Sequence, residues 1–573
     1  MTVSKRVTID APKGVEVHLG NARRLTPSLS ESDGLGTGYH RARTSTNFVS
    51  EADMMLQADD PGLLPRQRLK FALTPLEEEV FLRDRGLTTS YGIFGAPGSG
   101  KTFLYKYLLR QVLAVNRADP ERKIGALILD PKAALIDDLQ AIVAQPDVAR
   151  SDDLLVINAE MMAEGLHTNV IDCGVDTWAL ADLLVLAARS AGITASEDYW
   201  FLEWANLFGA SLFLLNNFNL EGVSNTQNAV TLRGLMDALL LTETVSSAGS
   251  DSGDRSGMRG IQRLAAEARL QLDRRPPEVR EDALIAINQI ERFFKADYVH
   301  TIMAFIARAY GPFQRHKYSC FSPERSRSVG AFYDEIIEDG RIVLVSMSAT
   351  DPLVAKTLCT LIKCLFQQTV IQRFGRLQSR RVVLLGCDEY AEIASEVPGQ
   401  PMGDGRFFSL SREFGCMGLL ATQSVNVLQA TSLKENWRSV FSTFGAKIFM
   451  RLADNETAKE ATELAGKGTW YVTSRGVSHG KEGLSGSEQK SIQQFDTVPS
   501  EVTTQGFEKG DAVAIGSLDG NATPELLHFF HVPSEDEQDA RIAAAQAQVQ
   551  AAGREEAPAI SATPTRRAVF EDE

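Results

Sequence analysis

The chain has 573 residues, of which 44% are hydrophobic and 23% are charged, a composition typical of a soluble globular protein with several domains. Its 59 basic and 74 acidic side chains leave a formal net charge of −15 at pH 7. This charge excludes general electrostatic attraction to nucleic acid or to an anionic membrane, so any phosphate-binding surface has to be local.

The sequence changes character along its length. Residues 1–66 are rich in Ser, Thr, Gly, Asp and Arg without sustained hydrophobic periodicity, so we expect a largely extended or mobile N-terminal arm. Over 67–175 and 326–533 short apolar runs such as GALILD, VVLLGCD and GLLAT alternate with helical patterns. Such runs are typical of strands buried on both faces, and the alternation predicts an α/β fold with a mostly parallel central sheet. Residues 534–573 are low in large apolar side chains, so we expect an acidic, mostly disordered C-terminal tail.

Two segments interrupt the strand pattern. Between 176 and 325 amphipathic helical patterns replace the strand runs, which predicts an inserted all-α domain. The Gly- and Ser-rich segment 473–491 carries Arg475, Lys481 and Lys490. It predicts a surface loop, which is either simply disordered or a mobile contact for a nucleic-acid backbone.

The segment GAPGSGKT fits the phosphate-binding pattern G-x-x-x-x-G-K-S/T and lies between the apolar run YGIF and a helical segment. In such a P-loop the backbone N–H groups and the positive end of the helix dipole face the phosphates of a nucleotide. Lys101 is expected to reach the β- and γ-phosphates of ATP, and the Thr102 hydroxyl to bind Mg²⁺. The predicted nucleotide-binding residues are Gly95, Ala96, Pro97, Gly98, Ser99, Gly100, Lys101 and Thr102.

An acidic pair follows the apolar run VVLLGC. Because a strand end places both carboxylates at the carboxyl edge of the sheet, we expect Asp388 to hold the Mg²⁺ and Glu389 to act as the general base. Asp130 also follows an apolar run, but no glutamate is next to it. We therefore expect Asp130 and Lys132 to be structural or to lie near the nucleotide.

Three further polar residues are candidates for the reaction. Gln423 follows the run GLLAT, where its amide is expected to contact the γ-phosphate or the attacking water, with a strand-end cap as the alternative. Hydrolysis at P-loops commonly uses an arginine, from the same subunit or from a neighbour. Arg412 and Arg451 are the candidates for that role, and an ordinary surface arginine is the alternative for each.

The ordered set GAPGSGKT, GALILDPK, HTNVID, SEDYWFLEWANLF, LLGCDEYAEI and SREFGCMGLLATQSVNVL resembles the conjugative coupling proteins of type IV secretion systems. These belong to the HerA/FtsK superfamily of RecA-like hexameric DNA translocases, and the similarity spans roughly residues 85–533. The resemblance implies a RecA-like P-loop NTPase domain that assembles as a hexameric ring with ATP and Mg²⁺ at the subunit interfaces. It also implies that DNA passes through the central channel, and that relaxosome or secretion-channel proteins bind the all-α domain and the tail.

The sequence departs from the membrane-anchored members of that family. It has no uncharged apolar run of about 18 residues, so we expect no membrane span and a cytoplasmic chain that a partner recruits to the inner membrane. The six cysteines form no C-x-x-C pair, which favours buried thiols in a reducing compartment. Three other functions remain open: a secretion ATPase for protein substrates, a cytosolic DNA translocase of a phage or defence system, and a nucleotide-gated adaptor.

Overall fold

The computed structural model divides the chain into two units, Met1–Val532 and Pro533–Glu573. The described part of the second unit contains a helix over 535–544, and the rest of the predicted tail lies outside the described residues. The structure describes residues 14–29, 69–159, 167–195, 197–218, 230–241, 259–321, 327–376, 379–396, 403–431, 433–480, 483–520 and 527–544.

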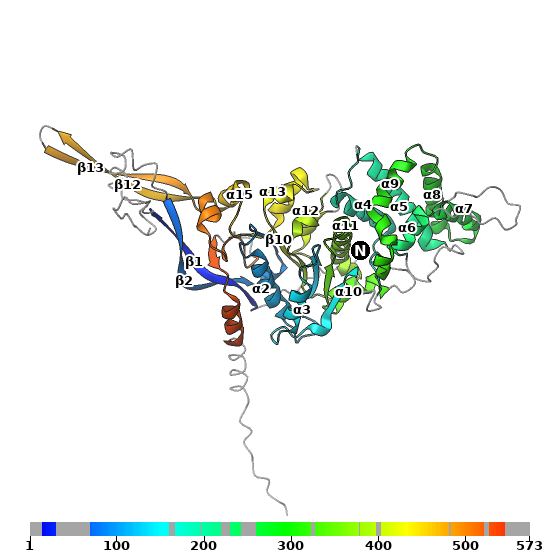
Figure 1. Cartoon of the computed structure of the whole chain (residues 1–573), viewed down its shortest axis with the longest axis horizontal. Coiled ribbons are helices and arrows are strands. Elements are labelled where there is room, and N and C mark those ends of the chain that lie inside the picture. Colours follow the sequence, from blue (N-terminus) through cyan, green and yellow to red (C-terminus); the bar gives the residue numbers. More distant parts are fainter. Residues whose placement is uncertain are drawn as a thin grey trace, which may run out of the picture. The chain divides into compact units, whose positions relative to one another are not determined.

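An eleven-stranded sheet forms the centre of the first unit, in the order β2-β1-β15-β14-β11-β3-β10-β9-β4-β8-β5 (Figure 1). The strands from β11 to β5 are parallel, whereas β14, β15, β1 and β2 extend one edge in antiparallel pairs. The strands are β1 (Glu16–Leu29), β2 (Leu69–Arg83), β3 (Ser90–Phe94), β4 (Gly125–Asp130), β5 (Leu154–Ile157), β8 (Ile342–Ser346), β9 (Val383–Cys387), β10 (Cys416–Thr422), β11 (Ala446–Phe449), β14 (Asp511–Gly516) and β15 (His528–His531).

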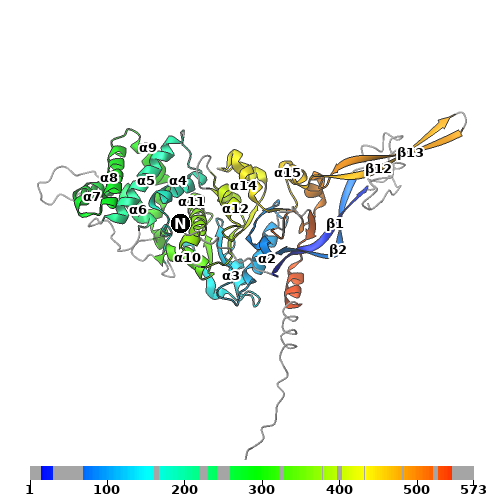
Figure 2. The ribbon, with the colours of Figure 1, turned by 180° about the vertical axis from the view of Figure 1, so that it is seen from behind.

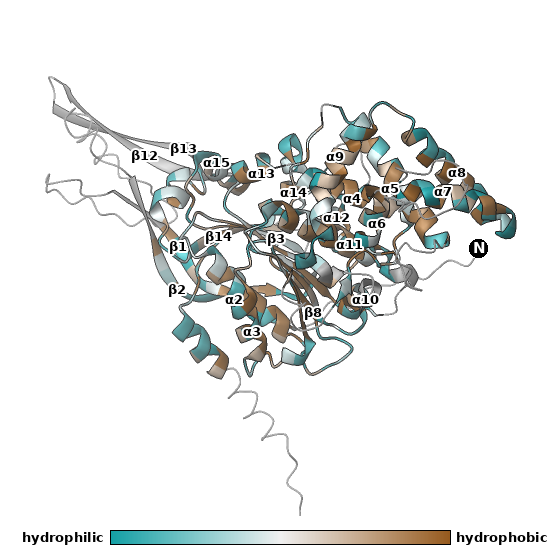
Figure 3. Cartoon of the chain, turned by 45° about the vertical axis from the view of Figure 1, so that its right-hand side comes forward, coloured by the Kyte–Doolittle hydropathy of each residue, from teal (hydrophilic) through white to brown (hydrophobic). Residues whose placement is uncertain are grey.

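The parallel strands are apolar throughout because both faces of the sheet are buried. Along β4, Leu127 and Leu129 join one hydrophobic cluster, while Ala126 and Ile128 join the cluster on the opposite face. Figure 3 shows the central strands as a hydrophobic layer between helices. The predicted fold class is therefore confirmed: a mostly parallel α/β sheet.

Helices cover both faces of the sheet (Figures 1 and 2). One cluster of buried side chains contains residues of α2 (Lys101–Ala114) and α3 (Ile136–Ala144). The other face is covered by α10 (Val329–Glu338), α11 (Pro352–Arg376), α12 (Asp404–Leu410), α13 (Val425–Gln429), α14 (Trp437–Thr443) and α15 (Asn455–Ala465).

The predicted inserted domain is helical and packs around the buried Trp204, which contacts the rings of Phe208 and Tyr310. A short parallel ladder between β6 (Thr168–Asn169) and β7 (Arg327–Ser328) joins the two ends of the insertion. The prediction of an all-α insertion is therefore confirmed. Its main helices are α4 (Thr177–Ser190), α5 (Tyr199–Asn217), α6 (Leu232–Leu240), α7 (Gly260–Gln271), α8 (Pro277–Phe293) and α9 (Val299–Tyr310).

The six cysteines are buried and form no disulfide, as their spacing predicts. Burial raises the pKa of the Cys364 thiol to about 11 and that of Cys416 to about 12. These thiols therefore stay protonated near neutral pH and pack as small apolar groups.

The N-terminal arm differs in part from the prediction. Within 1–66, β1 pairs with β2 and β15 and buries Val17, Leu19 and Ala22 against the sheet. Its alternating apolar residues occupy too short a stretch to stand out from the polar residues on both sides. Residues 1–13 and 30–66 lie outside the described residues.

The prediction of a surface loop over residues 473–491 is wrong. Over the described part of this segment, β12 (Lys467–Gly480) and β13 (Gly483–Asp496) pair as an antiparallel ladder, with Gly480 opposite Gly483. Lys481 lies outside the described residues. The pairing of backbone groups along the ladder overrides the weak strand propensity of the Gly and Ser residues, since strand propensity depends strongly on context.

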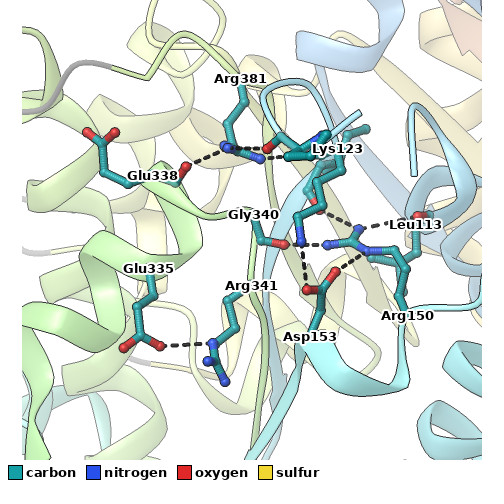
Figure 4. A network of polar contacts seen from close by, with 11 residues as sticks. Leu113, Lys123, Arg150, Asp153, Glu335, Glu338, Gly340, Arg341 and Arg381 are labelled. Carbon is teal, nitrogen blue, oxygen red and sulfur yellow. Dashed lines mark hydrogen bonds and ion pairs between the residues drawn. The ribbon is translucent and has the colours of Figure 1, made fainter. Parts of the chain in front are cut away.

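Two buried arginines donate hydrogen bonds to backbone carbonyl oxygens at the amino ends of the parallel strands (Figure 4). Arg150, 3% exposed, donates to the carbonyl oxygens of Leu113, Ile124 and Gly340. Its Nε also donates to the Asp153 carboxylate at 2.8 Å. Leu113 lies at the carboxyl end of α2, where helix carbonyls have no partners within the helix.

Arg381 acts in the same way before β9. Its guanidinium donates to the carbonyl oxygens of Pro120, Lys123 and Glu338, and Glu338 is the last residue of α10. Burial lowers the pKa of both Arg150 and Arg381. The two guanidinium groups therefore bind carbonyl oxygens at helix ends, which a parallel fold directs toward the amino edge of the sheet.

We expect Arg150→Met to lower the free energy of unfolding by about 3–5 kcal/mol, because it leaves three buried carbonyl oxygens without their donor and removes one of the two cations that contact the Asp153 carboxylate. Thermal and denaturant unfolding measure this loss. Arg122→Met is the matched control, since the Arg122 side chain is 71% exposed, and should change stability by less than about 0.5 kcal/mol. Equal melting temperatures for the two variants would show that the buried arginine is not structural.

Candidate nucleotide-binding and catalytic site

The predicted P-loop connects the end of β3 to the start of α2. Gly98 and Gly100 have φ values of +77° and +102°, a region that favours glycine. At Gly95 a Cβ would lie 2.5 Å from the Ser99 Oγ, so a side chain there would require Ser99 to move. The loop therefore has the turn that directs backbone N–H groups and the start of a 14-residue helix toward one point.

Neighbouring elements hold this loop by its backbone. The Ala96 N–H donates to the Arg451 carbonyl oxygen at 2.8 Å, beyond β11 on one side. The Gly95 N–H donates to the carbonyl oxygen of Thr422, the last residue of β10 on the other side, at 3.3 Å. The Gly510 N–H donates to the Ser99 carbonyl oxygen at 3.0 Å. The shape of the loop is therefore fixed by hydrogen bonds within the protein.

The register of the sheet brings the acidic pair to the same edge. β10 lies between β3 and β9, with Thr422 opposite Phe94 and Leu420 opposite Cys387. Asp388 directly follows Cys387, so it faces the first turn of α2 across the end of β10.

Thr102 and Asp388 are in direct contact. The Thr102 Oγ1 donates a hydrogen bond of 2.6 Å to the Asp388 Oδ2. The Asp388 Oδ1 is buried and has no hydrogen-bond partner. Burial raises the pKa of Asp388, while the Thr102 hydrogen bond and the Lys101 charge act in the opposite direction. A buried carboxylate oxygen without a partner, next to a hydroxyl, is a donor set suited to a hydrated Mg²⁺.

Glu389 lies between two ammonium groups. Its Oε1 is 3.0 Å from the Lys132 Nζ and 3.9 Å from the Lys101 Nζ. The Lys101 side chain is only 8% exposed, whereas that of Lys132 is 41% exposed. The Glu389 carboxylate is therefore held next to the P-loop lysine by a second lysine from the loop after β4.

Asp130, the competing acid, has a structural environment. It is 3% exposed and accepts hydrogen bonds from the Leu135 N–H at 2.8 Å and the Ser346 Oγ at 3.0 Å. It also accepts one from the Lys132 N–H at 3.3 Å. These bonds fix the loop after β4 and thereby place Lys132 near Glu389.

Gln423 directly follows β10, the strand between the P-loop strand and the acidic strand. It is half-buried at the carboxyl edge of the sheet. The structure thus places this residue at the same edge of the sheet as Asp388, and the contact of its amide with a phosphate or a water stays a prediction.

The two candidate arginines lie at opposite edges of the sheet. Arg412 is exposed in the turn that precedes β10, at the amino edge, so it is not brought to the P-loop of its own chain. Arg451 follows β11 at the carboxyl edge. Its Nη2 lies 3.9 Å from the position that a Cβ would occupy at Gly98.

Lys132 and Gly510 are site residues whose contacts the sequence does not reveal. Lys132 stands two residues after Asp130, the acid that the motif pattern ranks second, and the pattern carries no sign of its pairing with Glu389. Gly510, with a φ of +96°, follows the P-loop by several hundred residues and belongs to no recognisable motif. Its place beside Ser99 comes from the antiparallel strands that extend the sheet.

The fold and this site define a P-loop NTPase with a RecA-like sheet and an inserted all-α domain. Over residues 383–502 the chain matches the family model described as the TraM recognition site of TraD and TraG. No curated protein sequence matches the chain. None of the helices in the described residues combines the length and hydropathy that a membrane span requires.

The chain is similar to several solved structures at low sequence identity. The bacterial conjugative coupling protein TrwBdeltaN70, in a trigonal form with sulphate, has a TM-score of 0.50 and 13% identity, with 88% of this chain and 96% of that chain covered. TrwB in complex with the non-hydrolysable ATP analogue ADPNP has a TM-score of 0.49 and 12% identity, with 87% and 96% covered. VirB4 of Thermoanaerobacter pseudethanolicus has a TM-score of 0.43 and 10% identity, with 82% and 95% covered. The family model and the first of these folds confirm the resemblance to conjugative coupling proteins.

Proposed function

We propose that the chain is an ATP-driven DNA translocase of the coupling-protein type, which hydrolyses ATP at the subunit interfaces of a hexameric ring and moves DNA through its channel. We propose that this activity takes part in conjugative transfer or in another process of a mobile genetic element. The observation that carries this proposal is the Thr102–Asp388 hydrogen bond of 2.6 Å, which joins a complete P-loop to an acidic pair. A phosphate-binding protein without turnover has no need of the second acid, Glu389.

In this proposal the P-loop N–H groups and Lys101 bind the phosphates of ATP, and Thr102 and Asp388 hold Mg²⁺. The unpartnered Oδ1 of Asp388 supports that assignment. The metal ion supplies charge neutralisation at the phosphates when bound. Lys101 then exchanges its contact with Glu389 for one with the phosphates, which leaves Glu389 paired with Lys132.

Glu389 is the general base of the proposed reaction. A water attacks the γ-phosphorus, its proton passes to the Glu389 carboxylate, and the bond to the β–γ bridging oxygen breaks to release ADP and phosphate. Lys132 keeps the carboxylate oriented, at 3.0 Å in the structure. Gln423 orients the water or the γ-phosphate from the end of β10, and Arg451 approaches from the end of β11.

Arg412 has a different place in the proposal. Because it lies at the amino edge of its own sheet, it serves as a catalytic arginine only for the site of a neighbouring copy. That role requires the ring, in which each interface joins the P-loop of one subunit to a surface of the next.

The acidic composition fits a DNA contact that is confined to the channel. A net charge of −15 leaves the outer surface repulsive to nucleic acid. The family model for the TraM recognition site of TraD and TraG covers 383–502, and we propose a relaxosome-type protein as a partner. We further propose a cytoplasmic chain that such a partner or a secretion channel recruits to the inner membrane.

Glu389→Gln tests the proposed chemistry. We expect it to retain nucleotide binding and to lower the ATP turnover number about 100-fold or more, because the base is lost. Lys101→Ala should instead weaken nucleotide binding itself. The matched control is Glu278→Gln, which should stay within about twofold of the wild type since Glu278 is exposed on α8 of the inserted domain. Unchanged turnover in Glu389→Gln would contradict the assignment.

Lys132→Met tests the orientation of the base. We expect the turnover number to fall about 10-fold with little change in nucleotide affinity, because the Glu389 carboxylate loses the ammonium group that fixes it. Steady-state kinetics together with nucleotide titration separate the two effects. Lys295→Met removes an exposed lysine of the inserted domain, just after α8, and serves as the control; equal rates for both variants would refute the role of Lys132.

A further inference from the structure

The fully buried ion pair of Lys363 and Asp404 lies next to the segment that follows Asp388 and Glu389. The Lys363 Nζ of α11 is 2.6 Å from the Oδ2 of Asp404, the first residue of α12, and both side chains are 0% exposed. Burying two charges costs more free energy than an apolar pair of similar size in many proteins, so such a pair is weak evidence for a stabilising role. The hydrogen bonds of the two side chains indicate a role other than stabilisation.

The side-chain contacts of Asp404 come from neighbouring elements. Its Oδ2 accepts hydrogen bonds from the Tyr390 hydroxyl at 2.6 Å and from the Ser395 N–H at 2.9 Å, in addition to the Lys363 ammonium. Its Oδ1 accepts one from the Gln367 Nε2 at 2.9 Å. The carboxylate therefore joins α11 and α12 to the segment that follows β9.

Lys363 contacts the same segment. Its Nζ donates to the Ile393 carbonyl oxygen at 2.6 Å and to the Ser395 Oγ at 2.9 Å. Tyr390 is the residue directly after Glu389. The ion pair thus holds residues 390–395, which begin where the acidic pair ends.

The same helix reaches the inserted domain. α11 packs against α4, and Leu183 of α4 lines a recess together with Gln367, Gly403 and Arg406. Figures 1 and 2 both show α4, α11 and α12 as neighbours. Lys363 and Asp404 therefore lie between α4 of the inserted domain and the residues that follow Asp388 and Glu389.

We propose that Lys363 and Asp404 are positioning residues of the nucleotide site, which act through Tyr390 to hold Asp388 against Thr102 and Glu389 toward the P-loop. This inference rests on the proposed ATPase function. Neither residue touches the reacting atoms. Their effect is to fix the backbone on which both acids stand, and small displacements of catalytic groups reduce rates strongly.

Tyr390→Phe is the sharpest test. Replacing Lys363 or Asp404 leaves the other charge buried and unpaired and disturbs folding, whereas Tyr390→Phe removes only the hydroxyl that links the acidic segment to Asp404. The matched control is Tyr310→Phe, because Tyr310 is also fully buried and its hydroxyl donates to the Leu184 carbonyl oxygen at 2.5 Å in the inserted domain.

Two measurements are made on the full chain. We expect Tyr390→Phe to lower the ATP turnover number about 10-fold or more, while Tyr310→Phe stays within about twofold of the wild type. The second measurement is the ratio of affinities for the ATP analogue ADPNP with and without Mg²⁺. This ratio should fall in Tyr390→Phe, because Asp388 is displaced, and should be unchanged in Tyr310→Phe.

The outcomes separate the two claims. If the wild type shows no turnover, the proposed ATPase function fails, and the Mg²⁺ ratio still decides the positioning role. If Tyr390→Phe matches Tyr310→Phe in that ratio, or in turnover where the wild type is active, the positioning role is refuted. Equal losses of affinity with and without Mg²⁺ would also refute it, since they would indicate a general loss of structure.

Discussion

The parallel register of β3, β10 and β9 is the constraint on which the rest of the structure depends. It brings the P-loop after β3 and the acids after β9 to one edge, where the Thr102 hydroxyl meets the Asp388 carboxylate at 2.6 Å. A shift of one residue in either pairing would turn the side chains of a strand to the opposite face of the sheet. Because both faces of these strands are closely packed against helices, such a shift would misplace the side chains of the core, so the packing of the core determines the geometry of the polar site.

The same orientation explains where the charges lie. In a parallel α/β sheet helices begin near the carboxyl edge and end near the amino edge, so their dipoles give the two edges opposite polarity. Both ends of α2 show this: it begins at the P-loop, and the carbonyl oxygen of Leu113 near its end accepts a hydrogen bond from the buried Arg150. Anions are favoured at one edge of the sheet and cations at the other.

The sequence is sufficient to predict the P-loop and the acidic pair, because each motif directly follows a continuous apolar run. The same rule separates Arg412, which precedes the apolar run of β10, from Arg451, which follows that of β11, because only the end of a parallel strand lies at the P-loop edge. The sequence gives no sign of the Lys132–Glu389 and Lys363–Asp404 pairs. Each of these contacts joins residues that are distant along the chain and depends on how helices and loops pack.

The central claim is that ATP hydrolysis at this edge of the sheet is coupled to DNA. The most direct measurement is the ATP turnover rate of the purified full chain at low salt, with and without DNA. The account predicts a rate that rises several-fold with DNA and that falls back as salt screens the phosphate contacts. The same rate with and without DNA would contradict it.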